Sequence, residues 1–323
     1  MADKGIMRLQ YWGQVLAPNK LTLKQELERL DQECKEQLHT PLHYLLSFGR
    51  AEGDLMHPEA WPGGALPELC AIMGMEPLLQ PEFRAQFLMG EGSVALKPDA
   101  YGTRFAAAGC QDPEGRLTLY AVSPFVILAD KRKLGERPVP HSWEELMDPL
   151  YQGEIVTTGK RTPGSIPFFY FYYLFGPKGM EAFGENVKGG TSPVRMALEA
   201  GRAESMGGIY ILPWFFARCC PRRDQTEIIW PTEGALVYPL LLLAQKNRSP
   251  AAQRLADYFM GAKFAKDSAK ALVPSLHAES DPCFPPNGKL CFAGWKTLRT
   301  MDLERYRQTV GDFSMVPSLR EPK

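Results

Sequence analysis

The chain has no excess of charge of either sign and no long apolar run. Lysine plus arginine number 37, as do aspartate plus glutamate, over 323 residues. This balance gives no reason to expect a nucleic-acid partner. The longest strongly apolar stretch, Ala235 to Ala244, is about half of the roughly 20 residues that a membrane-spanning helix needs. We therefore interpret it as a buried core element.

The common signatures of enzymes and metal sites are also missing. The sequence contains no GxSxG elbow, no phosphate-binding P-loop and no HExxH motif. A GxGxxA run at 90–95 meets Pro98 instead of opening a helix, so dinucleotide binding does not fit. His39 and His43 have Pro41 between them, which argues against two metal ligands on one helix face. We expect a protein that is not an enzyme and has no cofactor and no metal site of its own.

The cysteines are odd in number, at seven, and form no CxxC pair. Such a set fits reduced thiols in a cytosol better than a disulfide framework, although a bridge between Cys283 and Cys291 stays open. The N-terminal MADKGIMRLQYWG has no apolar signal region followed by a cleavage site. Both observations lead us to expect a cytoplasmic protein. A periplasmic or cell-surface protein is the alternative if a signal was removed.

Cys219 and Cys220 are flanked by Arg218, Arg222 and Arg223. Neighbouring positive charge lowers a thiol pKa and favours the nucleophilic thiolate. The alternative, which we favour, is two cysteines near a surface beside solvated arginines.

The stretch from Leu117 to Gly159 carries the strongest fold signal. An apolar run from Tyr120 to Leu128 predicts a strand, and Glu154 to Thr158 predicts another. Between them, Ser142 with Glu145 three residues on has the pattern of a capping box at a helix start. The order strand, helix, strand is typical of an α/β unit with a parallel sheet.

The same stretch resembles the extracellular solute-binding proteins of ABC importers, bacterial family 1 and the ferric-binding-like group. The similarity lies in "SPFVILADKRKL", "P-x-SWEEL-x-DP" and "YQGEIVTTG". Weaker matches are "GGIYILPW" at 207–214 and "PTEG" at 231–234. The resemblance covers roughly Ile6 to His277.

This resemblance implies the two-lobed type 2 periplasmic-binding-protein fold. Each lobe is then a mixed sheet flanked by helices, and two hinge crossover strands join the lobes. We expect a discontinuous lobe I at 1–122 and 227–323, and lobe II at 123–226.

The resemblance also implies a function without covalent chemistry. A solute-binding protein captures a small ligand in an interlobe cleft by hinge closure, as the binding component of an ABC-type uptake system. The ligand is left open as an oxyanion, a metal chelate or a small organic solute, and the expected partner is an ABC permease, with the protein itself a monomer. The alternatives are a cytoplasmic ligand sensor or binding module of this fold, and an enzyme on this fold using Cys219 or Cys220.

The best candidate site is the turn Thr162, Pro163, Gly164 and Ser165, between the Glu154–Thr158 strand and a helix rich in aromatic residues. A helix N-terminus attracts anions through unpaired backbone N–H groups and its dipole. Ligands of open α/β sheets sit at such strand ends. The alternative is an ordinary capped loop. Rings at nearly every position of the aromatic helix must cover more than one surface, since a helix has one core stripe.

In lobe I, ligand contacts follow from the places where the family puts them, at the ends of the first strands. Tyr11 and Trp12 close the first strand, and their rings can line a pocket or fill the core. The same positional logic gives Ser47 and Gly49 after the second strand, and Met73 and Gly74 after the third.

Two further candidates lie later in the chain. Ferric-ion binders of this group use two adjacent tyrosines near the end of the strand that contains Tyr210, but residues 212–215 here are Leu-Pro-Trp-Phe. Tyr210 is therefore kept as a ligand contact, without iron. Glu233, in the turn near the hinge, is either a contact for a cationic group of the ligand or a structural carboxylate.

Overall fold

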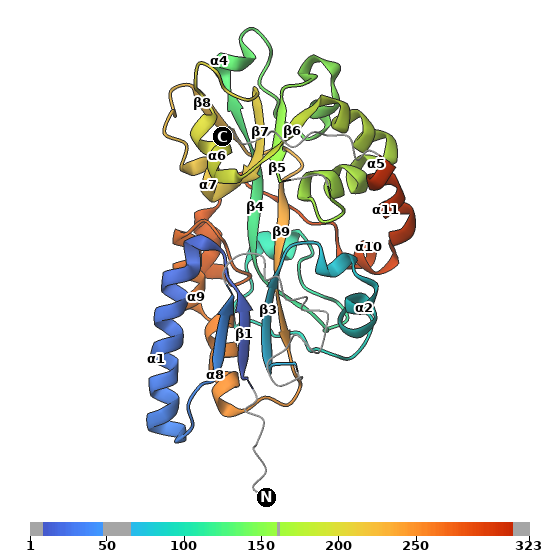
Figure 1. The fold of residues 1–323 in the computed structure, drawn as a ribbon. Helices are drawn as coiled ribbons and strands as arrows, with labels where there is room; N and C mark the ends of the chain where they lie inside the picture. The colour runs from blue at the N-terminus through green and yellow to red at the C-terminus, as the bar shows by residue number, and fades with distance from the viewer. Residues whose placement is uncertain (1–8, 48–65, 160–161, 313–323) are drawn as a thin grey trace, which may run out of the picture. The chain divides into compact units, whose positions relative to one another are not determined.

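The computed structural model describes residues 9–47, 66–159 and 162–312. The chain forms two compact units that both combine helices with strands (Figure 1). Unit 1 comprises Met1–Val122 and Pro239–Phe284, and unit 2 comprises Ser123–Tyr238 and Pro285–Lys323. The α/β prediction is confirmed. Gly49 lies outside the described residues.

The chain passes between the units along two strands. β4 (Thr118–Asp130) crosses after Val122, and β9 (Ala235–Ala244) crosses after Tyr238. The predicted lobes, 1–122 with 227–323 and 123–226, differ from these units because 227–238 and the chain from Pro285 onward belong to unit 2. The later segment is held there by β10 (Leu290–Cys291), which pairs with β9 at Ala235 and Leu236. The lobe bounds themselves stay a proposal.

In unit 1, β1 (Tyr11–Gln14) lies between β2 (Tyr44–Ser47) and β3 (Leu69–Met73), parallel to both. The end of β9 pairs antiparallel with β3. The longer helices of this unit are α1 (Lys20–Leu38), α8 (Pro250–Met260) and α9 (Ala262–Lys270). The shorter helical segments are η1 (Ala17–Asn19), η4 (Pro77–Leu79), α2 (Pro81–Phe83), η5 (Arg84–Leu88), α3 (Thr103–Ala107) and η8 (Ala278–Cys283).

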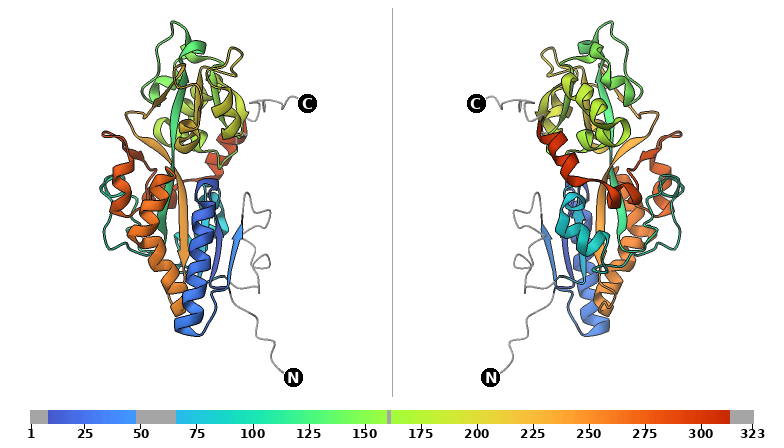
Figure 2. Two further views of the ribbon diagram at one scale, coloured as in Figure 1. Left: turned by 90° about the vertical axis from the view of Figure 1, so that its left-hand side faces the viewer. Right: turned by 90° about the vertical axis from the view of Figure 1, so that its right-hand side faces the viewer.

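Helix α1 forms where apolar residues recur at helical spacing. Leu23, Leu27, Leu30 and Cys34 are buried along one side of it. The helix packs beside α8, as both views in Figure 2 show. The helix ends at His39, which takes the left-handed conformation with φ 53°.

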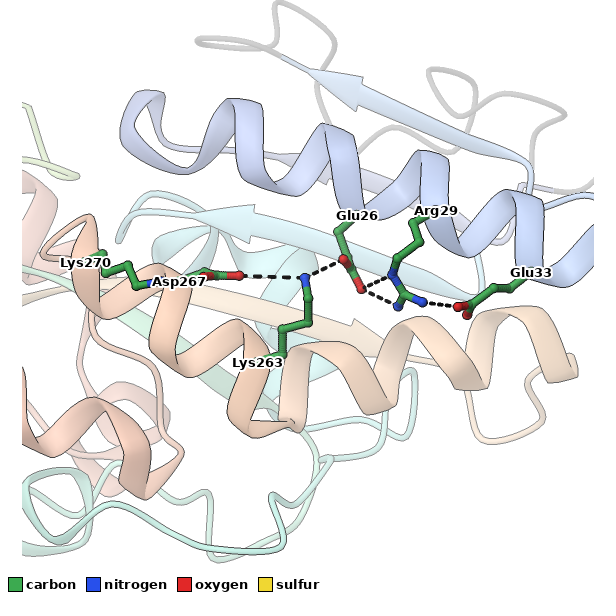
Figure 3. Close-up of polar contacts among 6 residues, drawn as sticks. All are labelled: Glu26, Arg29, Glu33, Lys263, Asp267 and Lys270. Carbon is green, nitrogen blue, oxygen red and sulfur yellow. Dashed lines mark hydrogen bonds and ion pairs between the residues drawn. The ribbon is translucent and has the colours of Figure 1, made fainter.

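An ion-pair network joins α1 to α9 within unit 1 (Figure 3). Glu26 has a side chain only 3% exposed, and it accepts hydrogen bonds from Arg29 Nε at 3.0 Å and Lys263 Nζ at 2.5 Å. Burial raises the pKa of Glu26, but the hydrogen bonds from Arg29 and Lys263 outweigh burial and leave the pKa below its ordinary value. The network thus ties two helices far apart in sequence through one buried carboxylate.

In unit 2, β5 (Ile155–Thr158) lies between β6 (Val187–Thr191) and β7 (Ile209–Pro213), parallel to both. β4 pairs antiparallel with β7 and with β8 (Thr226–Ile229). The helices are α4 (Lys131–Leu134), η6 (Glu144–Met147), η7 (Pro149–Tyr151), α5 (Ile166–Asn186), α6 (Pro193–Glu199), α7 (Trp214–Arg218), α10 (Trp295–Thr300) and α11 (Leu303–Asp312).

Half of the predicted capping box is present before η6, since Ser142 Oγ accepts the Glu145 N–H but the Glu145 carboxylate binds the N–H of His141 in place of that of Ser142. Glu145 N donates to Ser142 Oγ at 3.2 Å, and the Glu145 carboxylate accepts hydrogen bonds from Ser142 Oγ and His141 N at 2.8 and 3.0 Å. The helix after it is a single 3-10 turn and not an α-helix. Asp148 and Pro149 end it, because Asp148 caps the next turn through Leu150 N at 2.8 Å.

Candidate functional site

The carboxyl edge of the parallel strands in unit 2 gathers polar residues and helix starts. Thr158 at the end of β5 pairs in register with Thr191 at the end of β6, and Gly159 N donates to Thr191 O at 2.9 Å. Helices α5 and α6 both begin just beyond this edge. Ligands of open α/β sheets bind at such an edge, so the predicted lobe II site lies where the topology favours it.

The turn Thr162–Ser165 leads into α5, whose first part runs to Phe175 before a break at Gly176, where φ is 70°. Ser165 N donates to Thr162 O at 2.9 Å, and Phe169 N donates to Ser165 O at 2.9 Å. Thr162, Pro163 and Gly164 are half-buried. The sequence candidates of this turn therefore lie together, at the positive end of a helix dipole.

Ser165 leaves its hydroxyl unused, although it occupies the N-cap of α5. Ser192 and Ser249 cap α6 and α8 by accepting Arg195 N and Ala252 N at 3.3 Å each. Ser165 makes no such bond, and its Oγ has no hydrogen-bond partner among the described residues, although Ser165 is only 8% exposed. A buried hydroxyl without a partner is unfavourable unless a ligand or water completes it. Ser123 Oγ and Ser205 Oγ of unit 2 are likewise buried without a partner, but of these three only Ser165 lies at a helix N-terminus, so its hydroxyl is the strongest site signal in unit 2.

In unit 1, Tyr11 packs in the core and offers no surface to a ligand. Its side chain has no exposed surface, and its ring lies 5.7 Å from that of Phe259. A Cβ added at Gly13 would lie 2.0 Å from the Tyr11 hydroxyl, so the ring runs along β1 over Gly13. This placement supports the alternative that Tyr11 fills the core, and it does not support a ligand contact for Tyr11. Trp12, on the opposite side of the strand, is 8% exposed.

The ends of the three parallel strands of unit 1 lie together. Gln14 pairs in register with Ser47, and its side-chain Oε1 accepts the N–H of Met73 at 3.1 Å. Gly74 follows with φ 92° and donates its N–H to Pro239 O at 2.8 Å, so its conformation serves the turn after β3. Gln14 is a polar residue at this edge that the sequence analysis missed. Its position two residues after Trp12, at the strand end, is the signal that points to it.

Tyr210 lies in the core of unit 2. Its side chain has no exposed surface, and its hydroxyl oxygen accepts the N–H of Gly207 at 3.2 Å. Burial raises the pKa of Tyr210 to about 12, so the phenol stays protonated at neutral pH. This position gives Tyr210 a structural contact in place of the predicted ligand contact.

Glu233 closes a turn onto η6. Its carboxylate accepts the N–H of Trp143 at 2.9 Å and that of Glu144 at 3.2 Å. Trp143 Nε1 in turn donates to Gly234 O at 2.8 Å. The structural alternative for Glu233 therefore fits its contacts better than a ligand contact does.

The cysteine alternative finds little support. Cys220 is buried, with its sulfur 3.5 Å from Thr226 Oγ1, while Cys219 is exposed beyond the last residue of α7. Cys219 thus follows the C-terminal end of α7, and the negative end of a helix does not stabilise a thiolate. All seven cysteines are free thiols, including Cys283 and Cys291.

Over residues 9–47, 66–159 and 162–312, no three His, Cys, Asp or Glu side chains gather as a metal site. Within the same ranges, none of the helices combines the length and apolarity that crossing a membrane requires.

Comparison with protein families decides the class. Residues 65–301 match the family described as bacterial extracellular solute-binding protein. The chain belongs to this family. Its members are binding proteins that take up small ligands and work with an ABC permease, so this solute-binding protein captures a small ligand for uptake. No curated protein sequence matches the chain.

Solved structures give the fold of this solute-binding protein. The Trichodesmium protein IdiA (FutA), in complex with iron and citrate, has a TM-score of 0.65 at 13% identity and covers 94% of this chain and 98% of its own. The Mannheimia haemolytica ferric iron-binding protein A, in an open conformation, has a TM-score of 0.63 at 11% identity, covering 96% and 99%. AfuA from Actinobacillus pleuropneumoniae, with fructose-6-phosphate bound, has a TM-score of 0.58 at 15% identity, covering 95% and 97%. The predicted periplasmic-binding-protein fold is confirmed.

The expected cytoplasmic location is wrong, because the family is extracellular. The cysteine count misled because most of these thiols are core residues. Cys34, Cys70, Cys110, Cys220 and Cys291 are buried. A buried thiol behaves as a small apolar side chain and carries little information on compartment.

Proposed function

We propose that the solute is an anion and that unit 2 holds it at the Thr162–Ser165 turn and the N-terminus of α5. The observation that carries this proposal is the buried, unpartnered hydroxyl of Ser165 at the positive end of that helix. A hydroxyl donor beside helical N–H groups suits a phosphate, a sulfate or a carboxylate.

The named relatives are consistent with this class. One was solved with iron and citrate and another with fructose-6-phosphate, and both citrate and a phosphate ester carry negative charge. The buried, hydrogen-bonded hydroxyl of Tyr210 argues against direct iron binding through this tyrosine. An anion, alone or as the chelator of a metal, is the class that these residues support.

In the transport cycle, β4 and β9 serve as the hinge, because each strand continues from one unit to the other. The closed protein then delivers its solute to an ABC permease. No bond of the solute is made or broken, so solute recovered after incubation is chemically unchanged and the protein is not an enzyme.

Calorimetric titration with inorganic phosphate, citrate and fructose 6-phosphate tests the site. Ser165→Ala removes one hydrogen bond to a charged group, which contributes about 1.5–3 kcal/mol to binding. We therefore expect Kd to rise roughly tenfold or more. Because Ser165 makes no cap bond, the thermal midpoint of the variant should hold.

Ser249→Ala is the matched control, since Ser249 caps α8 in unit 1. It should lose about 1 kcal/mol of stability and keep the wild-type Kd. Native mass spectrometry of the purified protein identifies any co-purified solute. Equal anion affinity in wild type and Ser165→Ala, or a cationic co-purified solute, would refute the anion site.

A further inference from the structure

Helix α11 packs on α5 in unit 2, and it lies beyond the part of the chain that matches the family (Figure 1). The match ends at residue 301, and α11 starts at Leu303. Asp302 fixes the start of the helix by accepting Arg305 N at 3.0 Å. This chain therefore carries a C-terminal helix against the very element that opens its candidate site.

Tyr306 is the residue through which α11 reaches the site turn. Its side chain has no exposed surface. Its ring meets Phe169 and Tyr172 of α5 edge-on, at centroid distances of 5.9 and 4.9 Å. Its hydroxyl donates to the carbonyl oxygen of Pro163 at 2.6 Å. The aromatic face of α5 thus positions a hydrogen-bond donor on the turn.

The hydrogen bond from Tyr306 holds the Pro163–Gly164 peptide group, whose orientation distinguishes a type I from a type II turn. Thr162 to Ser165 is a four-residue turn closed by Ser165 N to Thr162 O, with Pro163 and Gly164 in the centre. A Pro-Gly centre favours type II, which needs a positive φ at glycine, whereas Gly164 is not among the glycines with positive φ. Types I and II differ mainly by a flip of the central peptide, here Pro163–Gly164.

We propose that Tyr306 is a positioning residue that holds the Thr162–Ser165 turn in its type I form and so sets the direction of the Gly164 N–H at the anion site. In a trans peptide the C=O and N–H point in opposite directions. With the Pro163 carbonyl turned to Tyr306, the Gly164 N–H faces away from α11. A flip to type II would turn that donor toward α11 and away from the anion. This inference rests on the proposed anion site.

The test uses the full chain with Tyr306→Phe, which keeps the ring and removes the hydroxyl. Tyr151→Phe is the matched control, because Tyr151 is also buried and its hydroxyl also donates to a proline carbonyl, Pro138 O, at 3.0 Å. Tyr151 precedes β5, at the opposite edge of the sheet from the site turn.

The first measurement needs no ligand. The nuclear Overhauser effect between Pro163 Hα and Gly164 HN is strong in type II and weak in type I. It should be weak in the wild type and in Tyr151→Phe, and grow in Tyr306→Phe. A loss of general stability would not move it. If the Overhauser effect in Tyr306→Phe is as weak as in the wild type, the positioning role of Tyr306 is overturned.

The second measurement is the Kd for inorganic phosphate. Tyr306→Phe should raise it roughly three- to tenfold, the usual worth of one hydrogen bond, and Tyr151→Phe should leave it unchanged. If Ser165→Ala weakens phosphate binding while Tyr306→Phe does not, the positioning role is overturned and the anion site stands. If Ser165→Ala has no effect on phosphate binding, the anion site itself falls, and the turn measurement still decides whether Tyr306 sets the turn.

Discussion

The carboxylate of Glu233 accepts two hydrogen bonds from the backbone N–H of Trp143, at 2.9 and 3.1 Å. A glutamate 90 residues later in the chain thereby does the work of an N-terminal cap for η6. The indole of Trp143 returns a bond to Gly234. The two residues lock a turn and a helix start of unit 2 to each other.

Glu233→Gln should therefore lower stability and leave binding intact. Loss of the charge weakens bonds to two backbone N–H groups, so we expect the free energy of unfolding to fall by about 1–2 kcal/mol. Urea unfolding measures this, with the exposed neighbour Glu144→Gln as the control. A large rise in Kd for the bound solute at unchanged stability would restore Glu233 as a ligand contact.

Tyr210→Phe should also act on stability alone. The substitution leaves the Gly207 N–H buried without its acceptor, which costs about 1–3 kcal/mol. Since the Tyr210 hydroxyl is buried and holds the Gly207 N–H, addition of iron(III) at neutral pH should give no absorption band from a bond between iron and the Tyr210 phenolate. The appearance of such a band in wild type and its loss in Tyr210→Phe would contradict the core position.

Glu26→Gln should remove a pH-dependent part of the stability of unit 1. The folded pKa of Glu26 is lowered, so its contribution is fully present above the unfolded pKa of about 4.3 and is lost as pH falls through the folded pKa. We expect the free energy of unfolding to fall by about 1–2 kcal/mol at pH 7. This is less than the loss on breaking a fully buried ion pair, because Arg29 and Lys263 are half-exposed.

Chemical denaturation of wild type and Glu26→Gln from pH 7 to pH 3 checks this. The two curves should converge at the acid end. Glu28→Gln, in an exposed pair with Lys24 on the same helix, is the control and should change stability by less than about 0.5 kcal/mol. A constant difference at all pH values would show that packing, and not charge, is lost.

The thiols should react in the order of their exposure. In native protein at pH 8, iodoacetamide should modify Cys219, which is exposed. Burial raises the pKa of Cys283 and of Cys291 to about 12, so both should react slowly. Peptide mapping after timed labelling measures each rate. Rapid labelling of Cys220 at the pace of Cys219 would contradict its burial.

Some features of the fold could be predicted from residues that lie close together in the sequence. Ser142 with Glu145 predicted the bond from Glu145 N to Ser142 Oγ, because such a bond depends on residues three apart. Leu23, Leu27 and Leu30 recur at helical spacing, so the sequence carries a local signal for α1 as well. The resemblance at 117–159 gave the fold and the class of function, which no local pattern could supply.

The sequence carries a local signal for the position of Tyr11 and none for the contact of Tyr306. Tyr11 looked like a pocket wall, yet Gly13, two residues on and on the same strand face, leaves room for its ring to lie down in the core. That aromatic-x-glycine spacing is a signal available in the sequence. Tyr306 has none, because its contact with Pro163 joins residues 143 apart.

The interleaving of the two units sets the order in which they can be completed during synthesis. Unit 1 has all its parts once Phe284 has been made, although most of unit 2 is translated before Pro239. Unit 2 must wait for the final stretch, and until α11 emerges the rings of Phe169 and Tyr172 lack the cover of Tyr306. A nascent or prematurely ended chain would therefore present an aromatic surface to chaperones and proteases while its other half is already finished.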